Sequence, residues 1–586
     1  MRDVERAVFC RYAGPALPRW RCFDELVDIV EARRPEDVVA RLEDVERAVA
    51  GGLCAAGLMS YEAAPGFDPA LVTHCADSMP LLWFALFRRT WEQDTPPREA
   101  PGECEVGPWR PTIRPAEYDD AIGRIKHNIA RGDTYQVNET YRLRATFRGE
   151  PWALFRRLCE AQRAEFGAYL DLGDQVVCSA SPELLLDLRG DALVTRPMKG
   201  TAPRGRTSSE DRRLRAMLTQ SAKDRAENAM IVDMMRNDLG RIAEKGSVQV
   251  DAAFDVEKFP TVYQMTSTVS ARSTASLTEI FRATFPAASI TGAPKVRTMQ
   301  IIRELERDPR GVYTGCIGWL APERRAVFSV AIRTVTIDRR AGIAQYGTGG
   351  GITWDSQSAG EFAESQTKAA LLTTEAPRFE LLETMLYQGA EGYSLLDGHL
   401  RRLADSAEYF DFAIDLTAVR RQLAALASRL GDQPQCVRLR IGRQGQIAIE
   451  ASPAPTVRAD AWRLRLAHAP VDPQNVFLYH KTTWREVYER AGAARGDCDD
   501  VVLWNAEGQA TETTIANLVV EKDERLVTPP IACGLLPGVL RQHLLETAQI
   551  HEDTVSLDDL RRARRLFAVN SVRGWMPAVL VGGETA

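Results

Sequence analysis

Two pairs of carboxylates in this sequence each stand three residues apart, Asp224 with Glu227 and Glu361 with Glu364. In an α-helix, residues i and i+3 lie on one face, so each pair can direct both carboxylates toward one point. Mg²⁺ prefers carboxylate oxygens and keeps several of its waters. The spacing would therefore allow both pairs to serve one magnesium ion, although a solvated helix surface is the plainer meaning of a single glutamate. Lys368 follows four residues after Glu364, on the same helix face.

A second chemically distinctive residue is Lys199, in the segment R-P-M-K-G-T-A-P-R-G at 196–205. A lysine attacks an electrophile only when deprotonated, which burial or neighbouring cations can arrange by lowering its pKa. The plain alternative is a solvated lysine near a turn. A run of glycines stands at Gly347, Gly349, Gly350 and Gly351. Such a run would let backbone N–H groups approach a carboxylate, although a simple turn is its commoner meaning.

Length and composition restrict the class of protein. At 586 residues the chain exceeds a single hydrophobic core, so at least two domains are expected. A net charge of −6 with scattered Lys and Arg predicts no nucleic-acid partner. The eleven cysteines form no C-x-x-C pair, which is typical of reduced thiols. No apolar run has membrane-spanning length and no signal sequence is seen, so we expect a cytoplasmic protein without a membrane partner.

The pattern of apolar residues predicts how these groups are positioned. From Tyr118 on, helical periodicity alternates with β-rich runs such as 327–337, which indicates an α+β layered core. Residues 94–103 are rich in Pro and Glu and predict an exposed loop. A short polar junction at 373–378 separates the stretch that begins at Tyr118 from a second one, whose pattern of apolar residues does not repeat the first. We expect a first domain over 1–375, with an N-terminal region at 1–110 and a catalytic core at 118–372, and a second over 376–586.

Several ordered blocks carry a resemblance to a known family. They include G-D-T-Y-Q-V-N at 132–138, S-P-E at 181–183, the Lys199 segment, F-P-A-A-S-I-T-G-A-P-K at 285–295 and G-T-G-G-G-I at 347–352. The stretch 118–372 resembles the chorismate-binding enzymes, which include anthranilate, aminodeoxychorismate, isochorismate and salicylate synthases. The resemblance implies an anthranilate-synthase-component-I-like fold and chorismate as substrate.

The same resemblance implies roles for single residues. Glu227 and Glu364 match metal-binding glutamates, with Asp224 and Glu361 beside them, and Glu183 matches a general acid near the departing hydroxyl. The residues that match substrate contacts are Gly200, Thr201, Tyr313, Arg333, Gly349 and Lys368.

Three positions choose the reaction within the family. Water-adding members carry a lysine base where Gln136 stands, which argues against isochorismate and salicylate chemistry. Anthranilate synthases usually carry alanine where Lys199 stands, whereas aminodeoxychorismate synthases carry a lysine that acts as a covalent nucleophile. Gln264 replaces a histidine common in anthranilate synthases, which agrees with release of an unaromatised product. The implied reaction replaces the C4 hydroxyl of chorismate by an amine.

Amination needs a source of ammonia. A glutaminase of the usual partner type has a Gly-x-Cys-x-Gly elbow with a His–Glu pair, and none of the seven histidines stands in such a pattern. The resemblance therefore implies a separate glutaminase subunit, with free ammonium as a poorer substitute.

From about Phe379 to Val581 the chain resembles the fold-type IV pyridoxal-phosphate enzymes, which have two α/β subdomains. Lys481 matches the lysine that bonds covalently to the cofactor and also moves a proton. Glu512 matches the acid that pairs with the pyridinium nitrogen. The residues that match phosphate contacts are Arg402, Val539 and Leu540 after Gly538, Asn570 and Ser571.

The fusion of the two regions favours consecutive steps, in which aminodeoxychorismate is made and then loses pyruvate to give 4-aminobenzoate, a folate precursor. An anthranilate synthase joined to a branched-chain or D-amino-acid aminotransferase-like domain is the alternative enzyme. A regulatory chorismate-binding module with inactive sites is the non-enzyme alternative. The oligomeric state stays open, and a homodimer through the second region is one option.

Overall fold

The computed structural model describes residues 7–12, 18–75, 78–98, 102–373, 377–456, 458 and 460–581. The chain divides into two compact units, residues 1–204 with 214–376, and residues 205–213 with 377–586. The junction expected near residue 375 lies outside the described residues. Helices and largely antiparallel sheets together confirm the α+β class. Within the described ranges, no helix is both long and apolar enough to span a membrane.

The first unit is built on a continuous antiparallel path of strands. In space the path runs β7–β19–β18–β9–β8–β1–β2–β4–β3–β16–β17–β10–β11–β14, and β12 and β13 also pair with β14. The bounds are β1 Ala7–Arg11, β2 Arg19–Ala32, β3 Cys54–Met59, β4 Leu82–Gln93, β7 Gln136–Gly149, β8 Phe166–Asp171, β9 Gln175–Ser181, β10 Leu184–Arg189, β11 Ala192–Arg196, β12 Met198–Pro203, β13 Gln249–Lys258, β14 Val262–Arg272, β16 Cys316–Ala321, β17 Arg325–Val330, β18 Thr334–Asp338 and β19 Ile343–Ile352. Short strands β5 Cys104–Val106, β6 Arg110–Pro111 and β15 Gly292–Ala293 pair with β7.

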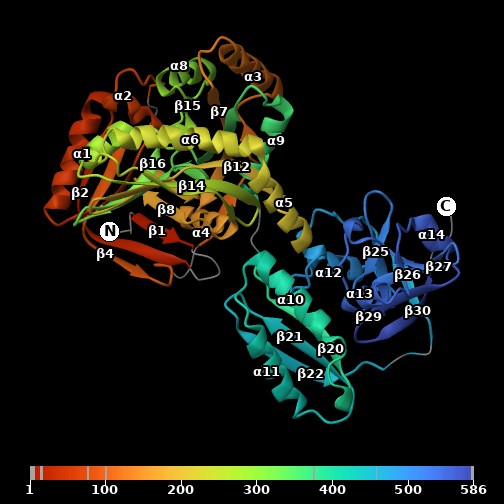
Figure 1. Ribbon diagram of the computed structural model, residues 1–586. Helices are drawn as coiled ribbons and strands as arrows, with labels where there is room; N and C mark the ends of the chain where they lie inside the picture. The colour runs from red at the N-terminus through yellow and green to blue at the C-terminus, as the bar shows by residue number, and fades with distance from the viewer. Residues whose placement is uncertain are drawn as a thin grey trace. The chain divides into compact units, whose positions relative to one another are not determined.

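Helices cover this path and bury its apolar side chains. Helix α6 lies across β12 and β14, and α9 packs on β19 (Figure 1). Ser221 begins α6 by accepting a hydrogen bond from the N–H of Asp224, which satisfies an otherwise unpaired group of the first turn. The helices of the first unit are α1 Pro35–Ala50, α2 Ala64–Phe67, α3 Pro115–Ala130, α4 Pro151–Gln162, α6 Ala222–Gly240, α7 Leu277–Thr284, α8 Lys295–Leu305 and α9 Ser358–Ala369. Helix α5, Ser208–Gln220, has residues in both units.

The second unit contains two sheets, in agreement with two subdomains. A three-stranded sheet, β20–β21–β22, packs against α10. An eight-stranded sheet has the order β25–β24–β23–β30–β29–β26–β27–β28. The bounds are β20 Leu381–Tyr387, α10 Leu396–Phe410, α11 Leu416–Ala427, β21 Gln435–Ile441, β22 Ile447–Pro453, β23 Trp462–Leu466, α12 Glu486–Ala493, β24 Asp500–Trp504, β25 Ala510–Thr513, β26 Asn517–Lys522, β27 Arg525–Thr528, α13 Val539–Glu546, β28 His551–Glu552, α14 Leu557–Arg562, β29 Leu566–Asn570 and β30 Gly574–Leu580.

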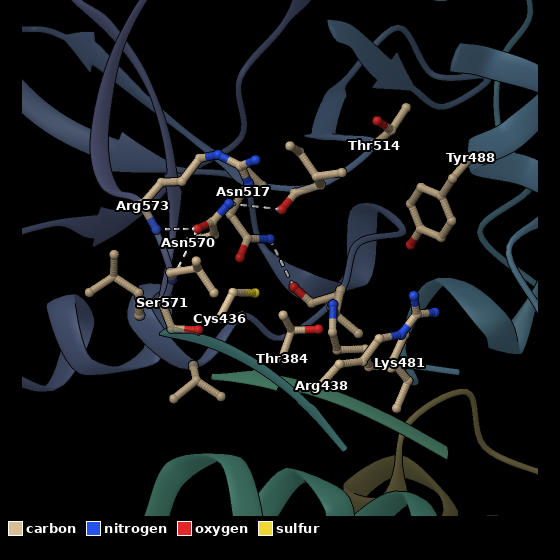
Figure 2. Close-up of a pocket in the computed structure, with 18 of the residues that line it drawn as sticks. Thr384, Cys436, Arg438, Lys481, Tyr488, Thr514, Asn517, Asn570, Ser571 and Arg573 are labelled. Atoms are coloured by element: carbon tan, nitrogen blue, oxygen red, sulfur yellow. Dashed lines mark hydrogen bonds between the residues drawn. The ribbon is translucent and has the colours of Figure 1, made fainter. Parts of the chain in front are cut away.

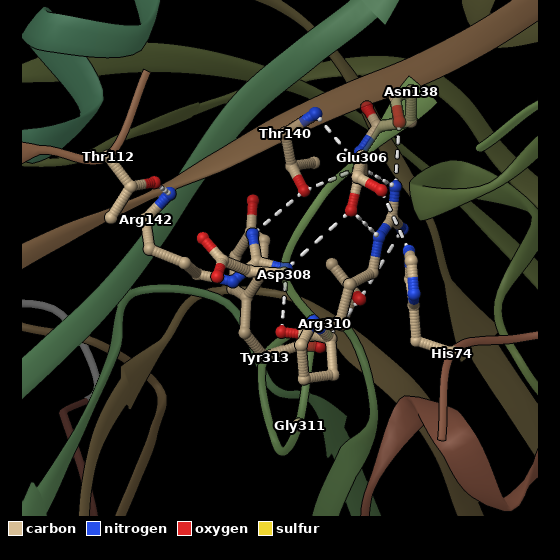
Figure 3. Close-up of polar contacts among 12 residues, drawn as sticks. His74, Thr112, Asn138, Thr140, Arg142, Glu306, Asp308, Arg310, Gly311 and Tyr313 are labelled. Carbon is tan, nitrogen blue, oxygen red and sulfur yellow. Dashed lines mark hydrogen bonds and ion pairs between the residues drawn. The ribbon is translucent and has the colours of Figure 1, made fainter. Parts of the chain in front are cut away.

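A buried ion network crosses the core of the first unit (Figure 3). Arg310 Nη2 lies 2.6 Å from Glu306 Oε1, and both side chains are almost wholly inaccessible to solvent. Arg142 is a second buried cation, 3.6 Å from the same carboxylate. Arg310 also donates to the carbonyl oxygens of Asn138, at 2.7 Å, and Ile290, at 2.8 Å. The network therefore ties β7 to the turn that contains Ile290.

Replacing Glu306 by leucine should strongly destabilise the first unit. The substitution leaves the charge of Arg310 buried without its partner, a change that costs about 3–5 kcal/mol. Urea denaturation of the purified protein measures the loss. Asp308→Asn is the matched control, because its pair with Arg144 is partly exposed and contributes at most about 1 kcal/mol. Equal stability of the two variants would contradict this account of the network.

Candidate functional site

One cavity of the first unit brings together every residue that the sequence predicts for its chorismate site. These residues come from β12 and β19, from α6 and α9, and from the segments that follow β9 and precede β16 and β18. The residues are Glu183, Lys199, Gly200, Thr201, Asp224, Glu227, Tyr313, Arg333, Gly349, Glu361, Glu364 and Lys368. Gln264 and Asn138 line the same cavity.

Lys199 lies on β12, partly accessible from the cavity but closely surrounded by protein. Burial lowers the pKa of its amine, Glu227 acts in the opposite direction, and the cation of Lys368 lowers it further. The lowered pKa makes the neutral, nucleophilic form more accessible than it is for a solvated lysine. A methyl group at Gly351 would overlap both Lys199 Nζ and the side-chain nitrogen of Gln136, so any larger residue there would displace these two groups. Gln136 is fully buried, and its amide makes no hydrogen bond within the described part of the chain.

Glu183 is a buried carboxyl at the same cavity. Burial raises its pKa to about 7, although a hydrogen bond from Ser289 and the charge of Lys199 both act to lower it. The Ser289 hydroxyl donates to Glu183 Oε1 at 2.5 Å. A carboxyl with this pKa keeps a proton in a substantial fraction of molecules at neutral pH, as a general acid requires.

The two carboxylate pairs stand in the first two turns of α6 and α9, on one cavity. Burial raises the pKa of Glu227. The Glu364 side chain is 43% exposed; partial burial acts to raise its pKa, but its ion pair with Lys368, at 2.8 Å, holds the pKa below the usual value. In the described ranges no group of three or more such side chains is close enough to hold a metal by itself. Mg²⁺ commonly takes one or two carboxylates plus water and substrate oxygens, so Glu227 and Glu364 fit such a partial shell.

The β-rich run predicted at 327–337 is divided into β17 and β18, because the chain turns at Arg333. Arg333 has a φ of 52°, in the left-handed region that side chains rarely adopt. Its guanidinium donates to the Lys368 carbonyl, and Lys368 Nζ donates to the carbonyl of Gly349 at 3.0 Å. The turn therefore brings Arg333 to the cavity beside Lys368, and both are among the substrate contacts that the sequence predicts.

Some lining residues received no role from the sequence. Ser289 and Tyr346 both face this cavity, and the Tyr346 hydroxyl donates to the carbonyl of Lys368 at 2.9 Å. Ser289 stands inside the 285–295 block that carries the family resemblance, so the sequence pointed to its segment. The direction of its hydroxyl depends on packing, which the sequence does not show.

The second unit contains a cavity of about 620 Å³, which is within the usual range for a cofactor or small ligand. All seven residues predicted for the cofactor line it: Arg402, Lys481, Glu512, Val539, Leu540, Asn570 and Ser571. Residues with no predicted role also face it, among them Thr384 and Arg438, which are opposite each other on β20 and β21 (Figure 2).

Lys481 and Glu512 both have pKa values near neutrality for the same physical reason. Burial lowers the pKa of Lys481 to about 8, with help from the charge of Arg402. Burial raises the pKa of Glu512 to about 7. The Glu512 carboxylate accepts hydrogen bonds from the Tyr488 hydroxyl at 2.8 Å and the N–H of Leu536 at 3.0 Å. These contacts fix its orientation in the cavity.

Arg402 and the start of α13, for which the sequence predicts phosphate contacts, line this same cavity. The guanidinium of Arg402 binds both oxygens of the buried Glu383, at 2.9 and 2.6 Å, and donates to the carbonyl of Pro537 at 3.2 Å. Gly538 is the N-cap of α13, so the N–H groups of Val539 and Leu540 have no partner within the helix. A helix start with unpaired N–H groups beside a cation suits a phosphate.

The Asn570 side chain is engaged in holding its own turn (Figure 2). Its oxygen accepts the N–H groups of Val572, at 3.1 Å, and Arg573, at 2.8 Å, and its nitrogen donates to the carbonyl of Ile515 at 3.2 Å. Asn570 therefore shapes the wall that presents Ser571.

Residues 380–581 match the model of the class IV aminotransferase family. The match implies pyridoxal phosphate as the cofactor of the second unit. The buried lysine, the buried acid and the cationic helix start of its cavity fit that molecule.

Known relatives resemble the first unit. The aminodeoxychorismate synthase component 1 of Klebsiella aerogenes is 45% identical over 262 residues, which are 44% of this chain and 58% of that protein. The anthranilate synthase component 1 of Aquifex aeolicus is 38% identical over 266 residues, which are 45% of this chain and 53% of that protein. The chain spans little more than half the length of these curated relatives.

Among solved structures, anthranilate synthase component I from Streptococcus pneumoniae TIGR4 has a similar fold, with a TM-score of 0.53 at 24% identity. The similarity covers 62% of this chain and 93% of that one, and it confirms the expected fold of the first unit. Residues 16–374, more than half of the chain, match the model described as chorismate binding enzyme. The chain therefore belongs to the chorismate binding enzyme family.

Proposed function

We propose that the chain converts chorismate and ammonia to 4-amino-4-deoxychorismate in the first cavity and then eliminates pyruvate in the second to give 4-aminobenzoate. The observation that carries the proposal is the meeting of Lys199 and Glu183 in one cavity, the amine with a lowered pKa and the acid with a raised one. The relatives named aminodeoxychorismate synthase component 1 support it.

In the first reaction Arg333 and Lys368 bind the substrate carboxylates. Glu183 gives a proton to the C4 hydroxyl, which leaves as water while the Lys199 amine forms a bond to C2 and both ring double bonds shift, C1=C2 to C1=C6 and C5=C6 to C4=C5. Ammonia then forms a bond to C4, both double bonds shift back, and the bond from C2 to Lys199 breaks, which returns the amine to Lys199. Glu227 and Glu364 would hold Mg²⁺, which supplies positive charge for the substrate carboxylate when bound.

Two glutamines support amination without aromatisation in this cavity. The amide of Gln136 cannot act as the base that activates water. Gln264 holds β12, because its nitrogen donates to the carbonyl of Gly200 at 3.0 Å and its oxygen accepts the Thr201 hydroxyl at 3.2 Å. An amide in this place cannot take a ring proton, so pyruvate elimination is assigned to the second cavity.

In the second cavity, Lys481, Glu512, Arg402 and the start of α13 would hold pyridoxal phosphate, which supplies an electron sink when bound. Lys481 then moves a proton on the substrate during elimination and aromatisation. Its pKa of about 8 allows it both to accept and to release a proton near neutral pH.

Ammonia would come from a separate glutaminase subunit. The cysteine in G-C-I-G at 315–318, Cys316, is buried in β16, and burial raises its thiol pKa far above the usual value. It therefore cannot act as a glutaminase nucleophile. A homodimer through the second unit and a cytoplasmic location stay predictions.

The direct test is product analysis by chromatography after incubation with chorismate, Mg²⁺, ammonium and pyridoxal phosphate. We expect 4-aminobenzoate and pyruvate in equal amounts, and aminodeoxychorismate when the second site is blocked. Anthranilate as the product would instead support the synthase–aminotransferase alternative. No turnover of chorismate would favour the inactive module.

Replacing Glu227 or Glu364 by glutamine should weaken the dependence of the first reaction on Mg²⁺. Each change exchanges a charged oxygen ligand for a neutral amide, and we expect at least about a tenfold rise in the Mg²⁺ concentration for half-maximal rate. Asp233→Asn is the matched control, because Asp233 lies on α6 but faces solvent. Unchanged magnesium titrations in both glutamine variants would remove these residues from the metal site.

A further inference from the structure

Ser289 stands in the short turn Ala288–Ile290 at the wall of the first cavity. It is 7% exposed, and its hydroxyl donates to Glu183 Oε1 at 2.5 Å. The short hydrogen bond joins two segments that lie about a hundred residues apart in the sequence.

The turn that carries Ser289 is fixed by its surroundings. Arg310 donates to the carbonyl of Ile290 at 2.8 Å and to that of Asn138 at 2.7 Å (Figure 3). The N–H of Asn138 donates to the carbonyl of Thr291 at 2.9 Å. Because Arg310 is itself held by the buried Glu306, the backbone of this turn has little freedom to withdraw the hydroxyl from Glu183.

Few groups act on the Glu183 carboxyl. Three groups lower the pKa of this carboxyl. Two belong to β12, the amine of Lys199 and the backbone of Met198, and the third is the Ser289 hydroxyl of the turn. Ser289 is therefore the side chain that holds the carboxyl by a direct hydrogen bond in the described part of the cavity wall.

We propose that Ser289 is a positioning residue of the first reaction, whose hydroxyl orients the Glu183 carboxyl so that its proton sits on the oxygen that Ser289 does not engage. The inference rests on the proposed role of Glu183 as the acid. A carboxyl held in this way delivers its proton along one direction, toward the departing C4 hydroxyl.

The proposal predicts a shift in the pH dependence of the first reaction. The Ser289 hydroxyl stabilises the ionised carboxylate, so its removal should raise the pKa of Glu183 above the present value of about 7. In Ser289→Ala the ionisation near pH 7 in the kcat/KM profile should therefore move to higher pH by about 1 unit. We also expect kcat to fall about tenfold, because the carboxyl loses its fixed orientation, while KM for chorismate changes less than about threefold.

The experiment measures chorismate consumption with ammonium and Mg²⁺ between pH 5 and 9, together with thermal unfolding of each variant. Ser289→Thr keeps a hydroxyl and should restore the wild-type profile. Ser289→Cys has only a weak donor and should lie between wild type and Ser289→Ala, so it carries the test where the alanine variant folds poorly. The control is Ser273→Ala, which removes a buried hydroxyl bonded to the Ile242 carbonyl outside this cavity and should keep the wild-type profile.

Two results would overturn the inference: a folded Ser289→Ala or Ser289→Cys protein with the wild-type ionisation, or a general loss of rate with no shift in pH. Glu183→Gln separates this failure from failure of the proposed function. If Glu183→Gln keeps the wild-type rate and profile, Glu183 is not the acid and the proposed mechanism fails. If it removes the ionisation near pH 7 while Ser289→Ala leaves it unmoved, only the role of Ser289 fails.

Discussion

Lys199→Ala should still bind chorismate but form aminodeoxychorismate at least about 10³-fold more slowly than the wild type. Arg333 and Lys368, the proposed anchors of the substrate, lie on other segments of the same cavity and remain in place. The bond from the lysine to C2 can no longer form, so ammonia would have to displace the hydroxyl directly. Chorismate binding by calorimetry and product formation by chromatography measure the two parts separately.

The control for this variant is Lys245→Ala, because Lys245 is exposed and lies outside the cavity. It should keep both binding and rate. A Lys199→Ala enzyme as fast as the wild type would remove the covalent route from the mechanism. Loss of chorismate binding in parallel with rate would show that Lys199 serves as an anchor rather than as a nucleophile.

Lys481→Ala should abolish release of 4-aminobenzoate, with a loss of at least about 10³-fold, and leave the first reaction running. The lysine lines the cavity of the second unit, whereas the chorismate residues all line a cavity of the first. Aminodeoxychorismate should therefore accumulate from chorismate, Mg²⁺ and ammonium. The visible absorbance of lysine-bound pyridoxal phosphate should also disappear.

Product analysis with and without an added independent lyase checks this result, since the lyase should convert the accumulated intermediate to 4-aminobenzoate. Lys522→Arg is the control, because Lys522 pairs with Asp553 and Asp559 rather than facing the cavity. Release of 4-aminobenzoate by Lys481→Ala alone at the wild-type rate would sink the lyase assignment. An aminotransferase role for residues 376–586 would then be the better account.

The sequence by itself determined which residue types were available for chemistry and in which local structures they stand. The spacing of Asp224 with Glu227 and of Glu361 with Glu364 predicted helix faces, and both pairs lie in the first two turns of helices. This works because helix geometry relates residues three apart without reference to the rest of the chain. The α+β class and the family were likewise readable from local periodicity and ordered motifs.

Only the tertiary structure decided which of these residues meet and what state their ionisable groups adopt. Lys199, Glu183 and Glu364 come from separate segments, and packing of β12, α6 and α9 places them on one cavity. The pairing of Arg402 with Glu383 and the direction of the Ser289 hydroxyl also depend on contacts between distant segments. A pKa shift depends on burial and on charges a few ångströms away, and neither distance is encoded in local sequence spacing.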